Sequence, residues 1–275
     1  MEIDDSRTCN LFNLASLARY LRVEPSVVVG YYDEILADAE FLAAVNRRMD
    51  EIRRAYGFTK GIFRMEAIDS VDWFAFERIL LYVLTRLTRP ERVLETGVYY
   101  GGNTSFILRA LDRNGSGRLI SIDLPDSAIR AASEPTERHP HVGDSELYSA
   151  DLKPGFMVPP PLRERWTFIE GDSHAVIPTL DERFDLYIHD SDHAMDFMRR
   201  ELTLARAVMK PGGIMVADDI DWSNAFHAFI VENAAYPLLL TDNGKDDLRV
   251  RTGVVDLAHP YADLPAITGR ACAVR

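Results

Sequence analysis

The chain has 275 residues and a mass of 31.1 kDa, which suits one large domain or one domain with an attached cap. It is 47% hydrophobic and 27% charged, which is ordinary globular composition and excludes a largely disordered chain. Its 43 acidic and 31 basic residues give a net charge of −12 and a pI near 5.1. That sign argues against nucleic acid or an anionic membrane as a partner, because both attract basic surfaces.

The sequence carries no targeting or disulfide pattern. The opening MEIDDSR lacks the basic and apolar regions of a secretory signal peptide. The longest apolar stretch, residues 79–84, is far shorter than the ~20 residues that cross a bilayer. Cys9 and Cys272 are too few for a disulfide framework or a cysteine zinc site. We therefore expect a cytoplasmic protein.

The first 89 residues are predicted to be helical. Apolar residues at steps of three or four over 35–56 predict one amphipathic helix, with Gly57 as its C-terminal cap. A second helix is predicted over 70–88, because Ser70 is a good N-cap and a proline follows the end of the pattern.

From Arg92 onward, short apolar runs alternate with helical stretches, which predicts an α/β fold with a parallel sheet covered on both faces. Residues 126–163 interrupt the alternation as a proline-rich insertion, either a lid or binding loop or a mobile surface segment. The predicted strands are 92–95, 118–122, 166–169, 184–188, 213–217, 248–257 and 270–274, and the predicted helices are 103–111, 173–180, 194–209 and 224–233.

Residues 95–104, ETGVYYGGNT, form a candidate ligand-binding turn after the first strand. Glycines there let the backbone approach a ligand, and the helix start supplies free N–H groups. The spacing Gly-x-x-x-Gly-Gly departs from the dinucleotide fingerprint, and Glu95 suits an ammonium group better than a pyrophosphate. Asp123, after the second strand, is placed to accept ribose hydroxyls. With Asp172 after the third strand, these acids line one crevice, although each alone also fits a solvated loop acid or a helix cap.

The segments VLETGVYYGGNTS, LISIDLPDS and FIEGDSHAVIPTL resemble class I S-adenosylmethionine-dependent methyltransferases. The resemblance implies a Rossmann-like, mostly parallel seven-stranded sheet with an antiparallel final strand. It also implies a helical cap or dimerisation region at 1–89, and an S-adenosylmethionine-binding methyltransferase domain at 90–275 that contains the insertion at 126–163.

The same resemblance implies where the cofactor lies. Glu95 and Gly97 would hold its methionine end, Asp123 its ribose, and the start of the third helix its adenine. His174 keeps two open roles, stacking near the adenine and capping its own helix. The implied cofactor-binding residues are Glu95, Gly97, Tyr99, Gly101, Asn103, Thr104, Asp123, Asp172, Ser173, His174 and Asp190.

A second acidic group follows the fourth and fifth predicted strands. Asp190, Asp218 and Asp219 are expected at one sheet edge, where converging carboxylates repel one another unless a cation neutralises them. Oxygen ligands favour Mg²⁺, while nearby histidines leave manganese, iron and zinc open. Capping of the next helix is the alternative for either member of the Asp pair.

This group resembles the metal site of small-molecule O-methyltransferases, such as the catechol and caffeoyl-CoA enzymes, which implies that Asp190, Asp218 and Asp219 hold the ion. That branch usually has lysine three residues after the first ligand, whereas this chain has His193, closer to bacterial enzymes that modify antibiotics and sugars. A histidine titrates near neutrality, so His193 is the predicted general base. Metal ligation, or support of a ligand, stays open for it.

The sequence thus predicts metal-dependent methyl transfer from S-adenosylmethionine to a hydroxyl of a small molecule, such as a bacterial secondary metabolite or a sugar moiety. One alternative is a metal-independent N- or O-methyltransferase that uses His193. Another is a non-catalytic S-adenosylmethionine-binding protein. The expected partners are a small-molecule acceptor and, by analogy, a second copy of the chain in a homodimer, with no nucleic acid and no membrane.

Overall fold

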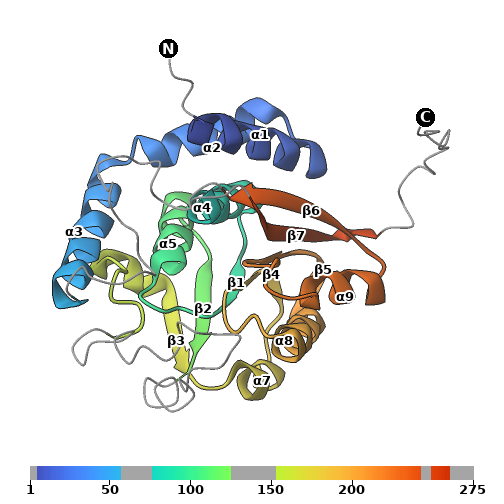
Figure 1. Cartoon of the computed structure of the whole chain (residues 1–275). Coiled ribbons are helices and arrows are strands. Elements are labelled where there is room, and N and C mark those ends of the chain that lie inside the picture. The colour runs from blue at the N-terminus through green and yellow to red at the C-terminus, as the bar shows by residue number, and fades with distance from the viewer. Residues whose placement is uncertain (1–4, 57–75, 125–152, 243–248, 261–275) are drawn as a thin grey trace.

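Seven strands form a single sheet in the computed structural model, which describes residues 5–56, 76–124, 153–242 and 249–260 (Figure 1). The strand order is β3-β2-β1-β4-β5-β7-β6. All neighbouring pairs from β3 to β5 are parallel, and β7 runs antiparallel to both β5 and β6. The strands are β1 Arg92–Thr96, β2 Arg118–Asp123, β3 Trp166–Glu170, β4 Phe184–His189, β5 Met209–Ala217, β6 Ala235–Asp242 and β7 Arg249–Pro260.

The mostly parallel sheet with an antiparallel strand near its end confirms the predicted fold class. The class I resemblance also implies that the predicted strands at 248–257 and 270–274 form an antiparallel hairpin. This pairing is wrong, because the first of them, β7, pairs with β6, a strand that the sequence pattern did not indicate. Pro237 and a run of leucines give β6 little β-branched character, and a proline is tolerated there because β6 lies at the sheet edge. The predicted strand at 270–274 lies outside the described residues.

Helices cover both faces of the sheet (Figure 1). One hydrophobic cluster packs the helices from α1 through α5 against one face of the sheet, and it includes Val93 and Ile188. A second cluster packs α8 and α9 against the other face, and it includes Leu94 and Tyr187. The helices are α1 Asp5–Tyr20, α2 Pro25–Leu36, α3 Ala39–Tyr56, α4 Phe76–Thr88, α5 Gly102–Asn114, α7 Ser173–Val176, α8 Met195–Val208 and α9 Ala225–Glu232, with 3-10 turns at η2 Pro160–Arg165 and η3 Ile177–Thr179.

The helix predicted over 35–56 is broken into α2 and α3 at Asp38. Its carboxylate accepts a bond of 3.3 Å from the backbone N–H of Phe41, as a residue at a helix start does. Arg109 and Arg113 of α5 bind the other carboxylate oxygen at 2.7 and 2.9 Å. A local pattern of apolar residues cannot show this break, because its stabilising partners are distant in sequence. The beginning of the helix predicted over 70–88 lies outside the described residues, and α4 occupies the rest.

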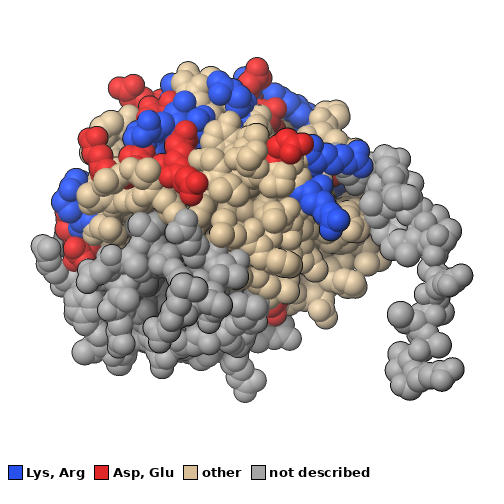
Figure 2. Space-filling view, turned by 90° about the horizontal axis from the view of Figure 1, so that it is seen from above, with Lys and Arg blue, Asp and Glu red and all other residues tan. Residues whose placement is uncertain are grey.

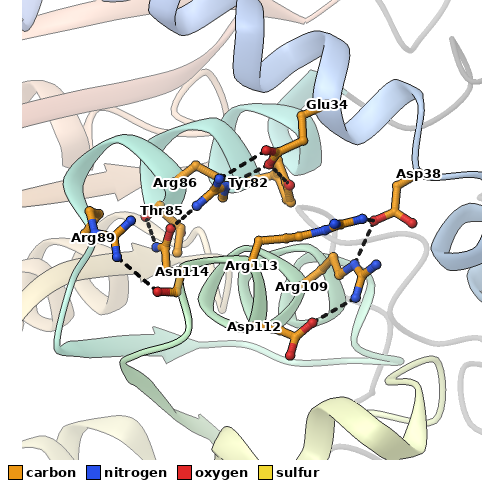
Figure 3. A network of polar contacts seen from close by, with 10 residues as sticks. All are labelled: Glu34, Asp38, Tyr82, Thr85, Arg86, Arg89, Arg109, Asp112, Arg113 and Asn114. Atoms are coloured by element: carbon orange, nitrogen blue, oxygen red, sulfur yellow. Dashed lines mark hydrogen bonds and ion pairs between the residues drawn. The ribbon is translucent and has the colours of Figure 1, made fainter.

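A polar network ties α2 to the helices that lie on the sheet (Figure 3). Glu34 of α2 accepts two hydrogen bonds from Arg86 of α4, at 2.7 and 3.1 Å, and another from Tyr82. The Arg86 hydrogen bond holds the pKa of Glu34 below its usual value. Together with the Asp38 contacts, these pairs anchor the N-terminal helices to α4 and α5. In the described ranges, no helix is both long and apolar enough to cross a membrane.

Candidate active site

The strand order reverses direction between β1 and β4, and ligands of open α/β sheets bind beside the carboxyl ends of the strands at such a point. The glycine turn after β1 lies there against the segment that follows β4. Gly97 has φ +82°, and a Cβ at this position would stand 1.9 Å from the carbonyl oxygen of Asp190. Only glycine therefore fits at 97.

The C-terminal part of the glycine turn lies against the end of the predicted insertion. Gly101 has φ +85°, and its Cβ would lie 2.8 Å from the Cα of Gly155. The carbonyls of Tyr99 and Tyr100 accept bonds from the backbone N–H groups of Gly155 and Met157, at 2.9 and 2.8 Å. The described end of the insertion thus packs directly on the glycine turn.

Glu95 is fully buried beneath the turn. Thr104 donates to both of its carboxylate oxygens, at 3.0 and 2.9 Å, and Ser121 donates at 2.6 Å. Burial raises the pKa of Glu95 to about 7 in spite of these donors. Glu95 and Thr104, both predicted to bind cofactor, therefore contact each other in the protein interior.

Asp123 fixes the conformation of the glycine turn. One carboxylate oxygen accepts bonds of 2.8 Å from the N–H groups of both Val98 and Tyr99, and the other accepts from Leu124 at 2.8 Å. Burial raises the pKa of Asp123. Tyr99 has φ +49°, a left-handed conformation that the Asp123 contact helps to hold.

The predicted adenine-side residues begin α7. Asp172 caps this helix by accepting a bond of 2.8 Å from the backbone N–H of His174. The His174 ring stacks on Phe197 with ring centroids 4.1 Å apart, so His174 is not the cap. Ser173 is buried and donates to Glu201 of α8.

Asn103, in the first turn of α5, connects two acids. Its Nδ2 donates to Asp190 Oδ2 at 2.9 Å and to Glu77 Oε1 at 3.0 Å. Burial raises the pKa of both acids well above the usual value. The charge of Asp218 raises both further, Asp190 adds to the shift of Glu77, and Asp219 adds to that of Asp190. Glu77, on α4, was missed by sequence reasoning. Glu77 could have been found as an acid that lies on the same helix face as Leu80 and Leu81, three and four residues later.

Asp218 and Asp219 follow β5 at the same edge. Asp219 has φ +45°, and its Oδ1 accepts a bond of 2.9 Å from the buried Arg251 of β7. The carboxylate oxygens of Asp190, Asp218 and Asp219 are the ligand type that a hard divalent cation prefers, and the charges of Asp218 and Asp219 add to the effect of burial in raising the pKa of Asp190. Among the described residues, however, no three His, Cys, Asp or Glu side chains are arranged to hold an ion.

His193 lies beside these acids. Its Nδ1 is buried and has no hydrogen-bond partner, and its ring is edge-on to His189 and 6.2 Å from the ring of Trp222. Burial and then the charge of His189 lower the pKa of His193 to about 4. The imidazole is therefore neutral at pH 7 and able to accept a proton.

A buried carboxylate that sequence reasoning missed supports this region. Glu201 of α8 accepts hydrogen bonds from Thr96 at 2.6 Å, Tyr187 at 2.9 Å and Ser191 at 2.9 Å, and it contacts Nδ1 of His189 at 2.5 Å. Burial would raise its pKa, but the His189 charge and these donors lower it to about 2. The sequence does not indicate this role of Glu201, because the residue lies inside a helical pattern and its hydrogen-bond donors come from four other segments.

Comparison with known proteins agrees with this architecture. Residues 94–220 match the family described as a methyltransferase domain. The chain matches no curated protein. A putative O-methyltransferase from Klebsiella pneumoniae aligns with a TM-score of 0.51 and 16% identity, over 78% of this chain and 90% of that one.

Two further solved structures align over 84% of this chain and 96% of their own. They are cofactor-bound Rv0187 from MTB, with a TM-score of 0.53 and 17% identity, and the O-methyltransferase TomG from Streptomyces achromogenes, with 0.50 and 18%. At these identities the likeness concerns the fold. Residues 94–220 therefore match a methyltransferase domain, and the chain has the Rossmann-like fold of these solved methyltransferase structures.

Proposed function

We propose that this protein transfers the methyl group of S-adenosylmethionine to a hydroxyl of a small molecule, with His193 as general base. The observation that carries the proposal is the half-buried, neutral imidazole of His193, whose Nδ1 has no partner, beside the acids at the ends of β4 and β5. A neutral base at the carboxyl edge of the sheet is what deprotonation of a hydroxyl requires.

The chain's own residues divide the work of this reaction. Bound S-adenosylmethionine supplies a methyl carbon that is electrophilic because it is attached to a sulfonium. The neutral imidazole of His193 takes the proton of the acceptor hydroxyl as the new oxygen–carbon bond forms and the carbon–sulfur bond breaks. The turn at Gly97, fixed by Asp123, holds the reactants in line, and positioning of this kind supplies much of the rate.

We also propose that the enzyme is metal-dependent, with Mg²⁺ bound by Asp190 and Asp218 and with Asp219 as a further ligand. Support comes from the charges of Asp218 and Asp219, which act after burial to raise the pKa of Asp190 and which a bound cation would offset. A bound Mg²⁺ would orient the acceptor oxygen and lower its pKa. Titration of Mn²⁺ into wild type and Asp218→Asn, followed by water-proton relaxation, tests the site without turnover. Equal Mn²⁺ binding by both proteins would contradict it.

The acceptor we propose is a bacterial secondary metabolite or a sugar moiety. TomG, which shares this fold, is described as an O-methyltransferase involved in tomaymycin synthesis.

We retain the division into an N-terminal cap at 1–89 and a methyltransferase domain at 90–275. Figure 2, which looks down on the molecule from above, shows an area of uncharged side chains below a band of acidic and basic ones, and Phe12 of α1 is 70% exposed. These features support a homodimer through the N-terminal helices, which light scattering of the purified chain tests.

The test of the proposed activity uses S-adenosylmethionine with a ¹⁴C-labelled methyl group and a panel of small hydroxyl and amine acceptors. Wild type is expected to label a hydroxyl compound, and His193→Ala is expected to bind S-adenosylhomocysteine without labelling it. Labelling of amines alone would favour N-methylation. Equal labelling by His193→Ala would remove the assigned base.

A further inference from the structure

The amide of Asn103 has an oriented and incomplete set of hydrogen bonds. The side chain is 92% buried, because its exposed fraction is 8%. Its Nδ2 carries two hydrogens, and two carboxylates, Glu77 and Asp190, each accept one bond from this nitrogen. The opposite orientation would place an oxygen against two carboxylates, so the network fixes which atom is nitrogen. The remaining atom, Oδ1, is buried and has no partner.

Glu77 and Asp190 thus converge on the amide of Asn103, whose Oδ1 adds a third oxygen acceptor to the same group of side chains. A buried carbonyl oxygen without a donor costs free energy unless a ligand completes it. The three groups also come from three elements, α4, the segment after β4, and α5, which meet beside the glycine turn. An ammonium group has three N–H donors, and it carries the positive charge that two neighbouring carboxylates favour.

Resting on the proposed function, we propose that Glu77 binds the α-ammonium group of the methionine end of S-adenosylmethionine, together with Asp190 and the Oδ1 of Asn103. The binding site then includes a residue of the N-terminal helices, which lie outside the matched methyltransferase domain at 94–220.

The neighbouring residue on α4 agrees with an amino-acid ligand. The guanidinium of Arg78 lies so close to Gly102, at the start of α5, that a Cβ there would stand 2.8 Å from its Nε. The start of α4 therefore offers one acid and one base next to each other. That pair matches a zwitterion, whose ammonium and carboxylate are likewise adjacent.

The experiment is a calorimetric titration of two ligands into four full-length proteins. S-adenosylhomocysteine carries the amino-acid end, whereas 5′-methylthioadenosine lacks it. The proteins are wild type, Glu77→Gln, and Glu34→Gln as a matched control. Glu34→Gln also removes a carboxylate bonded to α4, but on the surface network of Figure 3. Circular dichroism and thermal unfolding establish that each variant is folded, and Glu77→Asp serves as a second, charge-retaining variant.

Glu77→Gln is expected to weaken the binding of S-adenosylhomocysteine about 10- to 100-fold, because one charge-assisted hydrogen bond is lost. The binding of 5′-methylthioadenosine should stay unchanged. Glu77→Asp is expected to bind S-adenosylhomocysteine more tightly than Glu77→Gln, and Glu34→Gln to bind like wild type. An equal loss for both ligands, or no loss for S-adenosylhomocysteine, would overturn the assignment of Glu77. Failure of wild type to bind S-adenosylhomocysteine at all would overturn the proposed function instead.

Discussion

Glu201 and His189 contact each other at 2.5 Å, at a point where neither side chain is exposed to solvent. This contact turns Nδ1 of His189 toward α8 and presents the other edge of the ring toward the active-site edge, where His193 lies edge-on at 5.4 Å between ring centroids. The base region is thus supported from behind by a carboxylate that also binds Thr96, at the end of β1.

Glu201→Gln is expected to destabilise the protein by about 2–4 kcal/mol, because it removes the charge that several buried donors face. Urea unfolding at pH 7 measures this change. Glu232→Gln is the control: Glu232 binds Arg199 in an exposed pair, so its loss should cost less than about 1 kcal/mol. A comparable loss in the two variants would mean that the Glu201 network contributes little.

The same carboxylate predicts part of the response to acid. The pKa of Glu201 in the folded protein, about 2, lies below the unfolded value of roughly 4.3. Its stabilisation is therefore complete above about pH 4.3 and is lost as the pH falls toward 2. In Glu201→Gln the free energy of unfolding should depend less on pH in this window, and identical slopes in the two proteins would contradict the prediction.

Glu95 predicts a pH dependence of the opposite sign. Its folded pKa of about 7 lies above the unfolded value, so its contribution is present below about pH 4.3 and is lost as the pH rises through 7. Glu95→Gln mimics the protonated form, and its stability relative to wild type should rise between pH 5 and pH 8. Denaturant unfolding at both pH values measures this, with the exposed Glu170→Gln as control. A constant difference for Glu95→Gln would show that this carboxyl does not titrate there.

Gly97→Ala is expected to destabilise the ligand-free protein by more than about 3 kcal/mol and to abolish S-adenosylhomocysteine binding. The new methyl group would collide with the backbone of Asp190, and an alanine is strained at φ +82°. Gly115→Ala separates these effects, because Gly115 also has positive φ but has no atom within 4 Å of its Cβ position. That control should lose about 1 kcal/mol and bind ligand normally. Similar losses in both variants would mean that the contact with Asp190 is unimportant.

His193 predicts the pH profile of turnover. A base must be unprotonated, and burial lowers the pKa of His193 to about 4. Activity should therefore stay constant between pH 6 and pH 8 with respect to this group and fall as the pH approaches 4. The profile of kcat/KM against pH, measured with stability checked at each pH, reports this pKa. An inflection near 6.5 would indicate an exposed, ordinary histidine instead.

The sheet was predictable because its parallel strands are nearly continuous apolar runs and its site acids come directly after them. The positions of the acids 95, 123, 190, 218 and 219 at or next to strand ends were therefore predictable from the sequence, while their roles in a site stay predictions. What could not be predicted was the pairing of side chains across elements. Glu77 and Glu201 lie within helical patterns, and their partners are distant in sequence. The same reason explains the helix break at Asp38 and the missed strand β6, which depend on α5 and β7.

The central claim is that the crevice at the carboxyl ends of β1 and β4 binds S-adenosylmethionine. Calorimetric titration of S-adenosylmethionine into the wild-type chain tests it most directly. The expected result is one site per chain with a Kd below about 1 mM, within the range of enzyme substrates, and loss of that site in Gly97→Ala. A folded wild-type protein that gives no binding signal, or a Gly97→Ala variant that binds equally well, would contradict the claim.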